Sequence, residues 1–308
     1  MNKVITAKAC GKFILLGEHF IVTAASPALA FPVCELFCEV NVEEAPHNSF
    51  EAPCAYTIGQ EKEVKSRMEA SLNTVLRFIK KEGFTFKLAS NTNIPIQKGF
   101  GSSAAFSVAL CRAITSYFGE DYGVLGNSID AVESLFHKTP SGIDTTTILH
   151  QKPIRFEKGV GAQEIYNQAC DFILLDGGMR QDTASMIAHV KSIRENNQKL
   201  WESLSLRMKN IIEIAEHALH HGDVDDVVDS VREAQDILAS LGLSNDKINS
   251  YIKESMNEGA LVGKVSGAGG GGAIVLVTRR GEAHPIASRL KIRKLPVVAT
   301  VSALSEDE

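Results

Sequence analysis

"KGFGSSAAFSVAL", residues 98–110, places two glycines and two serines directly before a run of small and apolar residues. Glycine lets the backbone approach a ligand closely, and a helix N-terminus carries about half a positive charge. The stretch therefore predicts an anion site, most simply for phosphate, at the start of a buried helix over about residues 103–118. A glycine turn followed by a serine N-cap, at Ser102 or Ser103, is the alternative that the stretch leaves open.

Length and composition restrict the class of protein. The chain has 308 residues, 44% of them hydrophobic and 22% charged, which is typical of a globular protein with one large or two closely joined domains. Its formal net charge of −5 comes without blocks of like charge, so neither nucleic acid nor an anionic membrane is favoured as a partner. No apolar run approaches the length of a membrane span, and the N-terminus does not resemble a signal peptide. We expect a cytoplasmic protein whose six scattered cysteines form no zinc site or disulfide framework.

The order of periodic segments favours an α+β fold. Strand patterns fill the first forty residues, a helix is predicted over 61–80, and "FTFKLAS" alternates like a strand. Helices are predicted over about 103–118 and 124–137, and the segment that ends in "PSGIDTTT" is rich in turn residues. Residues 182–258 read as helical, with breaks at glycines, before the chain returns to strands with one helix near 282–290. We place a domain boundary near residue 165, which gives domains 1–165 and 166–308.

A second glycine-rich stretch, "KVSGAGGGG" at residues 264–272, lies between two predicted strands. So many glycines lose a large amount of chain entropy on folding, which a simple turn does not require. The stretch therefore predicts a close approach of backbone to a ligand or to another loop, with a glycine-rich β-turn as the alternative.

Three charged residues suit phosphoryl chemistry. Asp144 follows a Pro-Ser-Gly turn, where an acid near a phosphate loop is able to accept a hydroxyl proton. Glu133 lies eleven residues earlier on a predicted helix, and Mg²⁺ prefers carboxylate oxygen. Lys12 follows a glycine between two strand-like segments, where its charge would stabilise an alkoxide or a phosphoryl group. The local sequence also fits a turn-capping aspartate, a solvated glutamate and a surface lysine.

Taken together, "GKFILLGEH" (11–19), "GFGSSAA" (99–105), "PSGID" (140–144) and "KVSGAGGGG" resemble, in order and spacing, the galactokinase–homoserine kinase–mevalonate kinase–phosphomevalonate kinase (GHMP) superfamily. Within it, the chain is most similar to the mevalonate kinases. The resemblance implies Asp144 and Lys12 as catalytic residues, and Ser103 and Glu133 as magnesium ligands. It places the nucleotide phosphates at Gly99, Gly101, Ser102, Ser103 and Ala104. It places the acceptor beside Glu18, His19, Arg180 and Thr183.

The implied fold is a two-domain α+β GHMP kinase fold, with an N-terminal domain that contains a left-handed β-α-β unit and a C-terminal ferredoxin-like domain. The implied reaction is ATP- and Mg²⁺-dependent phosphorylation of a small molecule, mevalonate, on its 5-hydroxyl. Another kinase of the superfamily (phosphomevalonate kinase, mevalonate 3-kinase or a galactokinase-like enzyme) and an inactive ligand-binding relative are the alternatives. The helical stretch 182–258 predicts either a cover for the substrate pocket or the face of a homodimer. Cys10 and Thr145 depart from the residues usual in the motifs, yet neither removes a group that the reaction needs.

Overall fold

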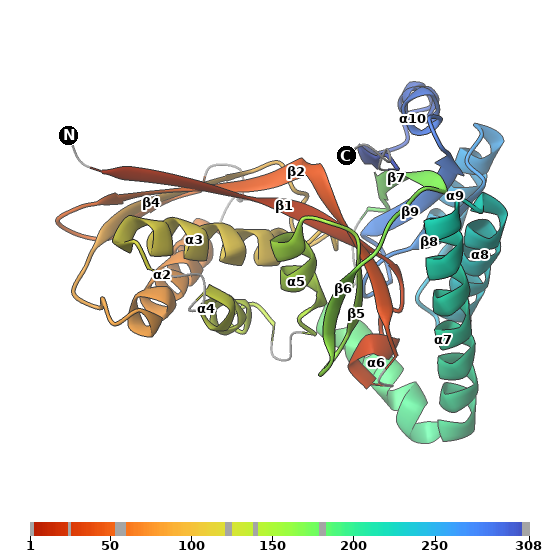
Figure 1. Cartoon of the computed structure of the whole chain (residues 1–308), viewed down its shortest axis with the longest axis horizontal. Helices are drawn as coiled ribbons and strands as arrows, with labels where there is room; N and C mark the ends of the chain where they lie inside the picture. The colour runs from red at the N-terminus through yellow and green to blue at the C-terminus, as the bar shows by residue number, and fades with distance from the viewer. Residues whose placement is uncertain are drawn as a thin grey trace. The chain divides into compact units, whose positions relative to one another are not determined.

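The computed structural model describes residues 3–23, 26–52, 60–120, 125–137, 141–178 and 183–303. The chain divides into two compact units that interleave along the sequence. The first unit consists of Met1–Gly11, Cys34–Ile96 and Gly101–Leu149, and the second of Lys12–Val33, Gln97–Phe100 and His150–Glu308. Strands β1 (Val4–Leu16) and β2 (Ala28–Glu44) each contribute residues to both units (Figure 1). Among the described residues, no helix is both long and apolar enough to cross a membrane.

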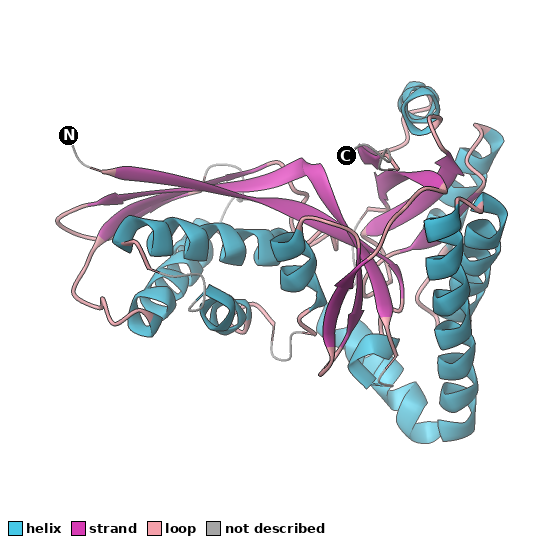
Figure 2. Cartoon of the chain, viewed as in Figure 1, coloured by secondary structure: helices cyan, strands magenta, loops and turns pink. Residues whose placement is uncertain are grey.

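The first unit has helices packed along one side of a sheet. Strand β3 (Ser49–Glu51) pairs in parallel with β4 (Phe86–Thr92), and α2 (Glu61–Phe78) connects them, so the three form a β-α-β unit. Strand β4 pairs antiparallel with β2, which also pairs with β1. Figure 2 shows the helices of this unit on one side of these strands. The remaining helices are α3 (Ser102–Phe118), α4 (Leu125–Glu133) and α5 (Ile143–His150).

Helix α3 is the buried helix that the opening stretch predicts. Its residues from Ala104 to Cys111 are all buried, and α3 packs against both α4 and α2. A helix that is apolar on every face is stable only when it is surrounded by other elements. The burial of α3 therefore fixes its N-terminal turn in place.

The second unit contains a four-stranded antiparallel sheet in the order β10-β7-β9-β8. Its strands are β7 (Cys170–Asp176), β8 (Val262–Val265), β9 (Ala273–Arg279) and β10 (Val297–Val301). The helices of this unit are α1 (Phe20–Thr23), α6 (Thr183–Asn196), α7 (Gln198–His221), α8 (Val224–Ser240), α9 (Asp246–Asn257) and α10 (Ala283–Ile292). Helices α6–α9 separate β7 from β8, and α10 separates β9 from β10, so the predicted ferredoxin-like arrangement is confirmed. Strands β5 (Ile154–Glu157) and β6 (Gly161–Glu164) pair with each other, and β5 pairs with β2.

Strand β7 is buried on both faces, as its continuous apolar run requires. Phe172 of β7 contacts the rings of Phe13 and Phe31, with centroids 5.2 Å and 5.0 Å away, and those two rings stack at 5.2 Å. Phe13 and Phe31 belong to the parts of β1 and β2 that lie in the second unit. This aromatic cluster packs the end of β1, where the first motif lies, against β7.

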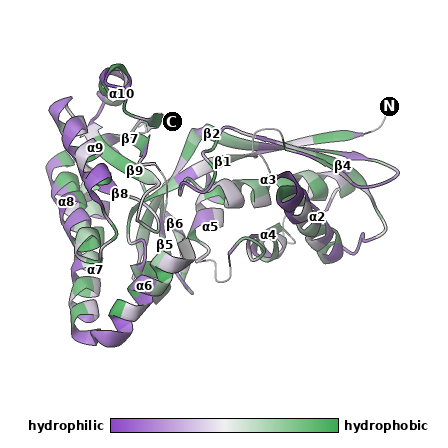
Figure 3. Ribbon diagram, turned by 180° about the vertical axis from the view of Figure 1, so that it is seen from behind, coloured by the Kyte–Doolittle hydropathy of each residue, from purple (hydrophilic) through white to green (hydrophobic). Residues whose placement is uncertain are grey.

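Helices α7 and α8 are amphipathic and pack against each other. Figure 3 shows hydrophobic and hydrophilic residues alternating along α7. Asn197 caps the start of α7, Asp223 caps the start of α8, and Gly222 ends α7 in the left-handed conformation. The predicted helix breaks at Gly222 and Gly242 are confirmed, because both glycines have positive φ angles after a helix.

Three local predictions are wrong. Lys12 lies inside an uninterrupted 13-residue strand, because Gly11 keeps an extended backbone. Asp144 lies in the first turn of α5 rather than on a turn, because the hydroxyls of Thr145 and Thr147 donate to Gly142 O and Ile143 O within the helix. The helix predicted to reach residue 137 ends at Glu133.

The second glycine-rich stretch packs on the first, which confirms the predicted approach to another loop. Gly272 has a φ of +80°, and a Cβ placed on it would lie 2.7 Å from Lys98 O. Its own carbonyl accepts a 2.6 Å hydrogen bond from Gly177 N. Lys98, Gly177 and Gly272 belong to the same unit. Three backbone segments therefore meet at Gly272, and only glycine fits there.

Gly272→Ala should destabilise the protein more than Gly281→Ala. Both glycines have left-handed φ angles, +80° and +83°, but a Cβ at Gly281 would have no atom of the described residues within 4 Å. Gly281→Ala carries only the conformational cost of about 1–2 kcal/mol, whereas Gly272→Ala adds a backbone clash. Urea unfolding of both variants measures the difference. Equal midpoints would show that the two glycine stretches do not pack tightly.

Candidate active site

The N-terminus of α3 carries no side-chain cap. Its N-cap residue is Gly101, in the left-handed conformation with φ 81°, and glycine has no side chain that could cap the helix. The alternative of a serine N-cap is wrong, because Ser102 and Ser103 are already helical and the Ser103 hydroxyl donates to Glu133. The exposed N–H groups of a helix start bind anions, so the first turn from Ser102 to Ala104 suits a phosphate group.

Ser103 and Glu133 meet behind this turn, within the first unit. Ser103 Oγ donates to Glu133 Oε1 at 2.9 Å, and Ser107 Oγ donates to Glu133 Oε2 at 3.0 Å. Glu133 is only 3% exposed, so it is not the solvated helix glutamate of the alternative interpretation. A hydroxyl and a carboxylate are hard oxygen donors, which fits Mg²⁺.

His137 is a residue that the sequence interpretation missed. Its Nε2 lies 3.1 Å from Ser103 Oγ and 3.4 Å from Glu133 Oε1. The only sequence signal is its spacing of four residues from Glu133, and the turn continues there because His137 N donates to Glu133 O at 3.0 Å. Ser107, also missed, lies one helical turn after Ser103. Among the residues that the structure describes, no three His, Cys, Asp or Glu side chains form a metal-binding group.

Lys12 contacts Gly99 and Phe100, the start of the predicted phosphate loop (residues 99–104), within the second unit. Its Nζ donates to Gly99 O at 3.1 Å, and its backbone N donates to Phe100 O at 2.9 Å. Lys12 is 3% exposed, so it is not a surface lysine. The contact brings a positive charge to the glycines that precede α3.

Glu18 forms a buried ion pair with Lys264, which sequence interpretation also missed. Lys264 Nζ donates to Glu18 Oε1 and to Val265 O, and both charged side chains are at most 1% exposed. Burial raises the pKa of Glu18 and lowers the pKa of Lys264, and each charge opposes the shift of the other. Glu18 Oε2 is buried and has no hydrogen-bond partner among the residues that the structure describes. The predicted contact of Glu18 with the acceptor stays a prediction.

His19, the next residue, contacts the second glycine-rich stretch. Its Nε2 lies 3.1 Å from Ala268 O, so the ring N–H donates to that carbonyl. Ser266 holds the same stretch to β1, because its hydroxyl donates to Ile14 O at 2.8 Å and accepts from Ile14 N at 3.2 Å. Residues before and after Glu18, namely Ile14 and His19, therefore both form hydrogen bonds to the glycine-rich stretch.

The structure shows fewer contacts for the remaining predicted site residues. Asp144 is half-buried in α5 of the first unit, whereas Lys12 belongs to the second, so their joint action stays a prediction. Thr183 is the first residue of α6. Arg180 lies outside the described residues.

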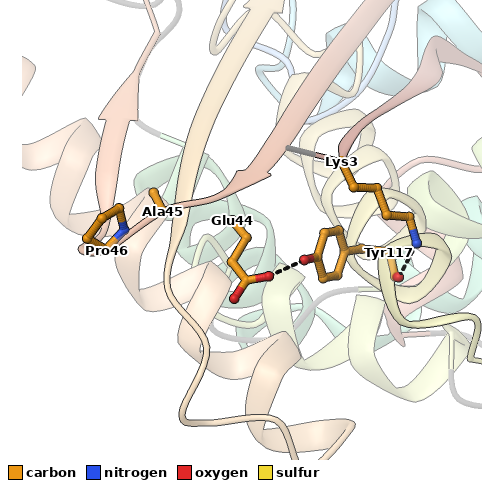
Figure 4. Close-up of a pocket in the computed structure, with 5 residues that line it drawn as sticks. All are labelled: Lys3, Glu44, Ala45, Pro46 and Tyr117. Carbon is orange, nitrogen blue, oxygen red and sulfur yellow. Dashed lines mark hydrogen bonds between the residues drawn. The ribbon is translucent and has the colours of Figure 1, made fainter. Parts of the chain in front are cut away.

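A cavity of about 330 Å³ in the first unit contains none of the predicted site residues. It is lined by Lys3, Glu44, Ala45, Pro46 and Tyr117 (Figure 4). The Tyr117 hydroxyl donates to Glu44, which raises the pKa of Tyr117, and Lys3 Nζ donates to Tyr117 O at 2.6 Å. These polar groups satisfy one another, so we assign no function to the cavity.

Comparisons with known proteins identify a family and relatives that match this chain along most of its length. The GHMP kinases N terminal domain matches residues 68–152, and the GHMP kinases C terminal domain matches residues 215–295. A mevalonate kinase of Aeropyrum pernix is 27% identical over 296 residues, which cover 92% of this chain and 91% of the relative. L. major mevalonate kinase, solved with R-mevalonate, has a TM-score of 0.84 at 21% identity and covers 99% of this chain and 98% of its own. Streptococcus pneumoniae phosphomevalonate kinase, solved with phosphomevalonate and AMPPNP, has a TM-score of 0.78 at 16% identity, with coverage of 96% and 99%.

Lys264→Met should destabilise the protein by about 3–5 kcal/mol, because it leaves a buried carboxylate without its counter-charge. The pKa of Glu18 would then rise further, so the folded state would bind a proton that the unfolded state releases. The loss of stability should therefore shrink as the pH falls through the raised pKa of Glu18 towards its value in the unfolded chain.

The double variant Glu18→Gln/Lys264→Met removes both charges and is the control. Urea unfolding at several pH values should show that it recovers most of the lost stability. A double variant less stable than Lys264→Met alone at neutral pH would contradict a buried ion pair.

Proposed function

We propose that this chain, which belongs to the GHMP kinase superfamily, transfers the γ-phosphoryl group of ATP to the 5-hydroxyl of mevalonate. The two matched domains together span more than half of the chain. The chain is an ATP-dependent small-molecule kinase. The observation that carries the proposed role of the site is the pair of oxygen donors, Ser103 and Glu133, behind the uncapped start of α3.

Binding of ATP is assigned to the phosphate loop and the first turn of α3. We assign the phosphates to Gly99, Gly101, Ser102, Ser103 and Ala104. Ser103 and Glu133 would hold Mg²⁺, which neutralises the charge on the phosphate oxygens when it is bound. Lys12 adds a fixed charge, since it is buried and its ammonium group already contacts the phosphate loop at Gly99 O.

Asp144 is assigned to the acceptor hydroxyl. Asp144 lies in the first turn of α5, and a carboxylate oxygen is able to accept a hydrogen bond or a proton from a hydroxyl group. We leave open whether Asp144 removes the proton fully or orients the hydroxyl. Phosphoryl transfer depends mainly on positioning and charge, and both roles fit this requirement.

Mevalonate is proposed as the acceptor because the A. pernix relative, a mevalonate kinase, matches this chain along almost all of its length. The carboxylate of mevalonate needs a cation or several N–H donors, which we assign to His19 and Arg180, with Thr183 and Glu18 beside them. A fold does not decide the acceptor, since phosphomevalonate kinase shares it. A cytoplasmic location and a homodimer stay predictions.

The test is a panel of acceptors with ATP and Mg²⁺, with ADP release followed by a coupled assay. Mevalonate should give the highest kcat/KM, above phosphomevalonate and galactose. ADP release should fall about 10²–10⁴-fold in Asp144→Asn, because the amide cannot accept the proton. This variant also controls for a contaminating kinase. A preference for another acceptor would overturn the substrate assignment, and unchanged turnover in Asp144→Asn would overturn the role of Asp144.

A further inference from the structure

Three atoms form a closed triangle at the start of α3. Ser103 Oγ lies 2.9 Å from Glu133 Oε1 and 3.1 Å from His137 Nε2, and the latter two atoms are 3.4 Å apart. The Ser103 hydroxyl donates its one proton to Glu133. His137 thus lies within hydrogen-bond distance of both groups assigned to the cation, although nothing in the proposed reaction gives it a role.

A hydroxyl has one proton to donate, which sets a condition on the cation site. While Ser103 donates to Glu133 Oε1, that proton lies between the two oxygens. For both oxygens to face the same cation, the hydroxyl must direct its proton to another acceptor. The ring nitrogen of a neutral His137 is such an acceptor, and it is already 3.1 Å away. The one proton of the Ser107 hydroxyl is directed to Glu133 Oε2 or to Ser103 O, each 3.0 Å away.

We propose that His137 is a positioning residue of the cation site, which takes over the hydrogen bond of the Ser103 hydroxyl and so frees Glu133 Oε1 for a divalent cation. The inference rests on the proposed function of Ser103 and Glu133. No bond is made or broken in this step, since the hydroxyl only rotates from one acceptor to the other.

The two carboxylate oxygens of Glu133 differ in a way that fits this exchange. Oε2 is held by Ser107, which is fully buried, so the carboxylate stays anchored while Oε1 changes partner. Oε1 faces Ser103 and His137, and the His137 side chain is 46% exposed. The side from which a hydrated cation arrives is therefore the side on which His137 lies.

The experiment measures cation binding directly. Mn²⁺ is titrated into protein saturated with AMPPNP, and free Mn²⁺ is measured by electron paramagnetic resonance. His137→Leu should weaken Mn²⁺ binding roughly 10–100-fold, the range for loss of a group that orients a metal ligand. His137→Gln places an amide oxygen at a similar reach and should stay close to the wild-type affinity. Affinity for AMPPNP without metal should not change in either variant.

Two further variants separate the possible outcomes. His150→Leu removes a histidine that likewise faces a glutamate, at 3.7 Å, and should leave Mn²⁺ affinity unchanged. Glu133→Gln should weaken Mn²⁺ binding, as the proposed metal site requires. If Glu133→Gln weakens binding but His137→Leu does not, or if His137→Gln fails like His137→Leu, the role of His137 is overturned and the metal site stands. If Glu133→Gln leaves Mn²⁺ affinity unchanged, both are overturned. His137→Ala replaces the leucine variant if circular dichroism shows that the latter is misfolded.

Discussion

The contact between Gly272 and the carbonyl of Lys98 is the constraint on which the site depends. It brings two backbone segments so close that a single Cβ would separate them. The next residue after Lys98 is Gly99, whose carbonyl accepts a hydrogen bond from Lys12 Nζ, and Gly101 is the N-cap of α3. The position of Lys98 is thus set by packing of backbone on backbone, which explains why glycine is needed at position 272.

The end of β1 is fastened to the same place by polar contacts. Ser266, His19 and the Glu18–Lys264 pair each join it to the second glycine-rich stretch or to the strand that precedes it. A buried ion pair adds little net stability compared with apolar residues, but it strongly disfavours arrangements that separate the charges. We infer that the ion pair fixes the position of the end of β1 along the strand direction. It thereby also fixes the position of Lys12 relative to the predicted phosphate loop.

The sequence predicts well what depends on local patterns. The apolar run of β7, the amphipathic α7 and α8, and the buried α3 follow from periodicity and capping residues. It fails where residues that are common in turns are accommodated inside a helix or a strand. The threonines of α5 suggest a turn, yet their hydroxyls are satisfied inside the helix. Glycine at position 11 suggests a break, yet β1 continues through it.

Some residues of the candidate site could likewise be identified from the sequence, and others could not. Ser103, Glu133 and Lys12 could be selected from motifs because their chemistry is recognisable in short stretches. Lys264 could not be paired with Glu18 from the sequence, because 246 residues separate them and neither lies in a periodic pattern that points to the other. His137 lies four residues beyond Glu133, but nothing local indicates that Ser103, 34 residues earlier, is its partner. Contacts between residues so far apart in the sequence arise only when the chain has folded.

The central claim is that the uncapped start of α3 holds the phosphates of ATP, with Ser103 and Glu133 at its cation. A crystal structure with AMPPNP and Mn²⁺ tests it most directly, because Mn²⁺ is located by its anomalous scattering. The account predicts phosphate oxygens within hydrogen-bond distance of the backbone N–H groups of residues 102–104, and the Mn²⁺ peak between Ser103 Oγ and Glu133 Oε1. Phosphates bound elsewhere, or a Mn²⁺ peak that contacts neither residue, would contradict it.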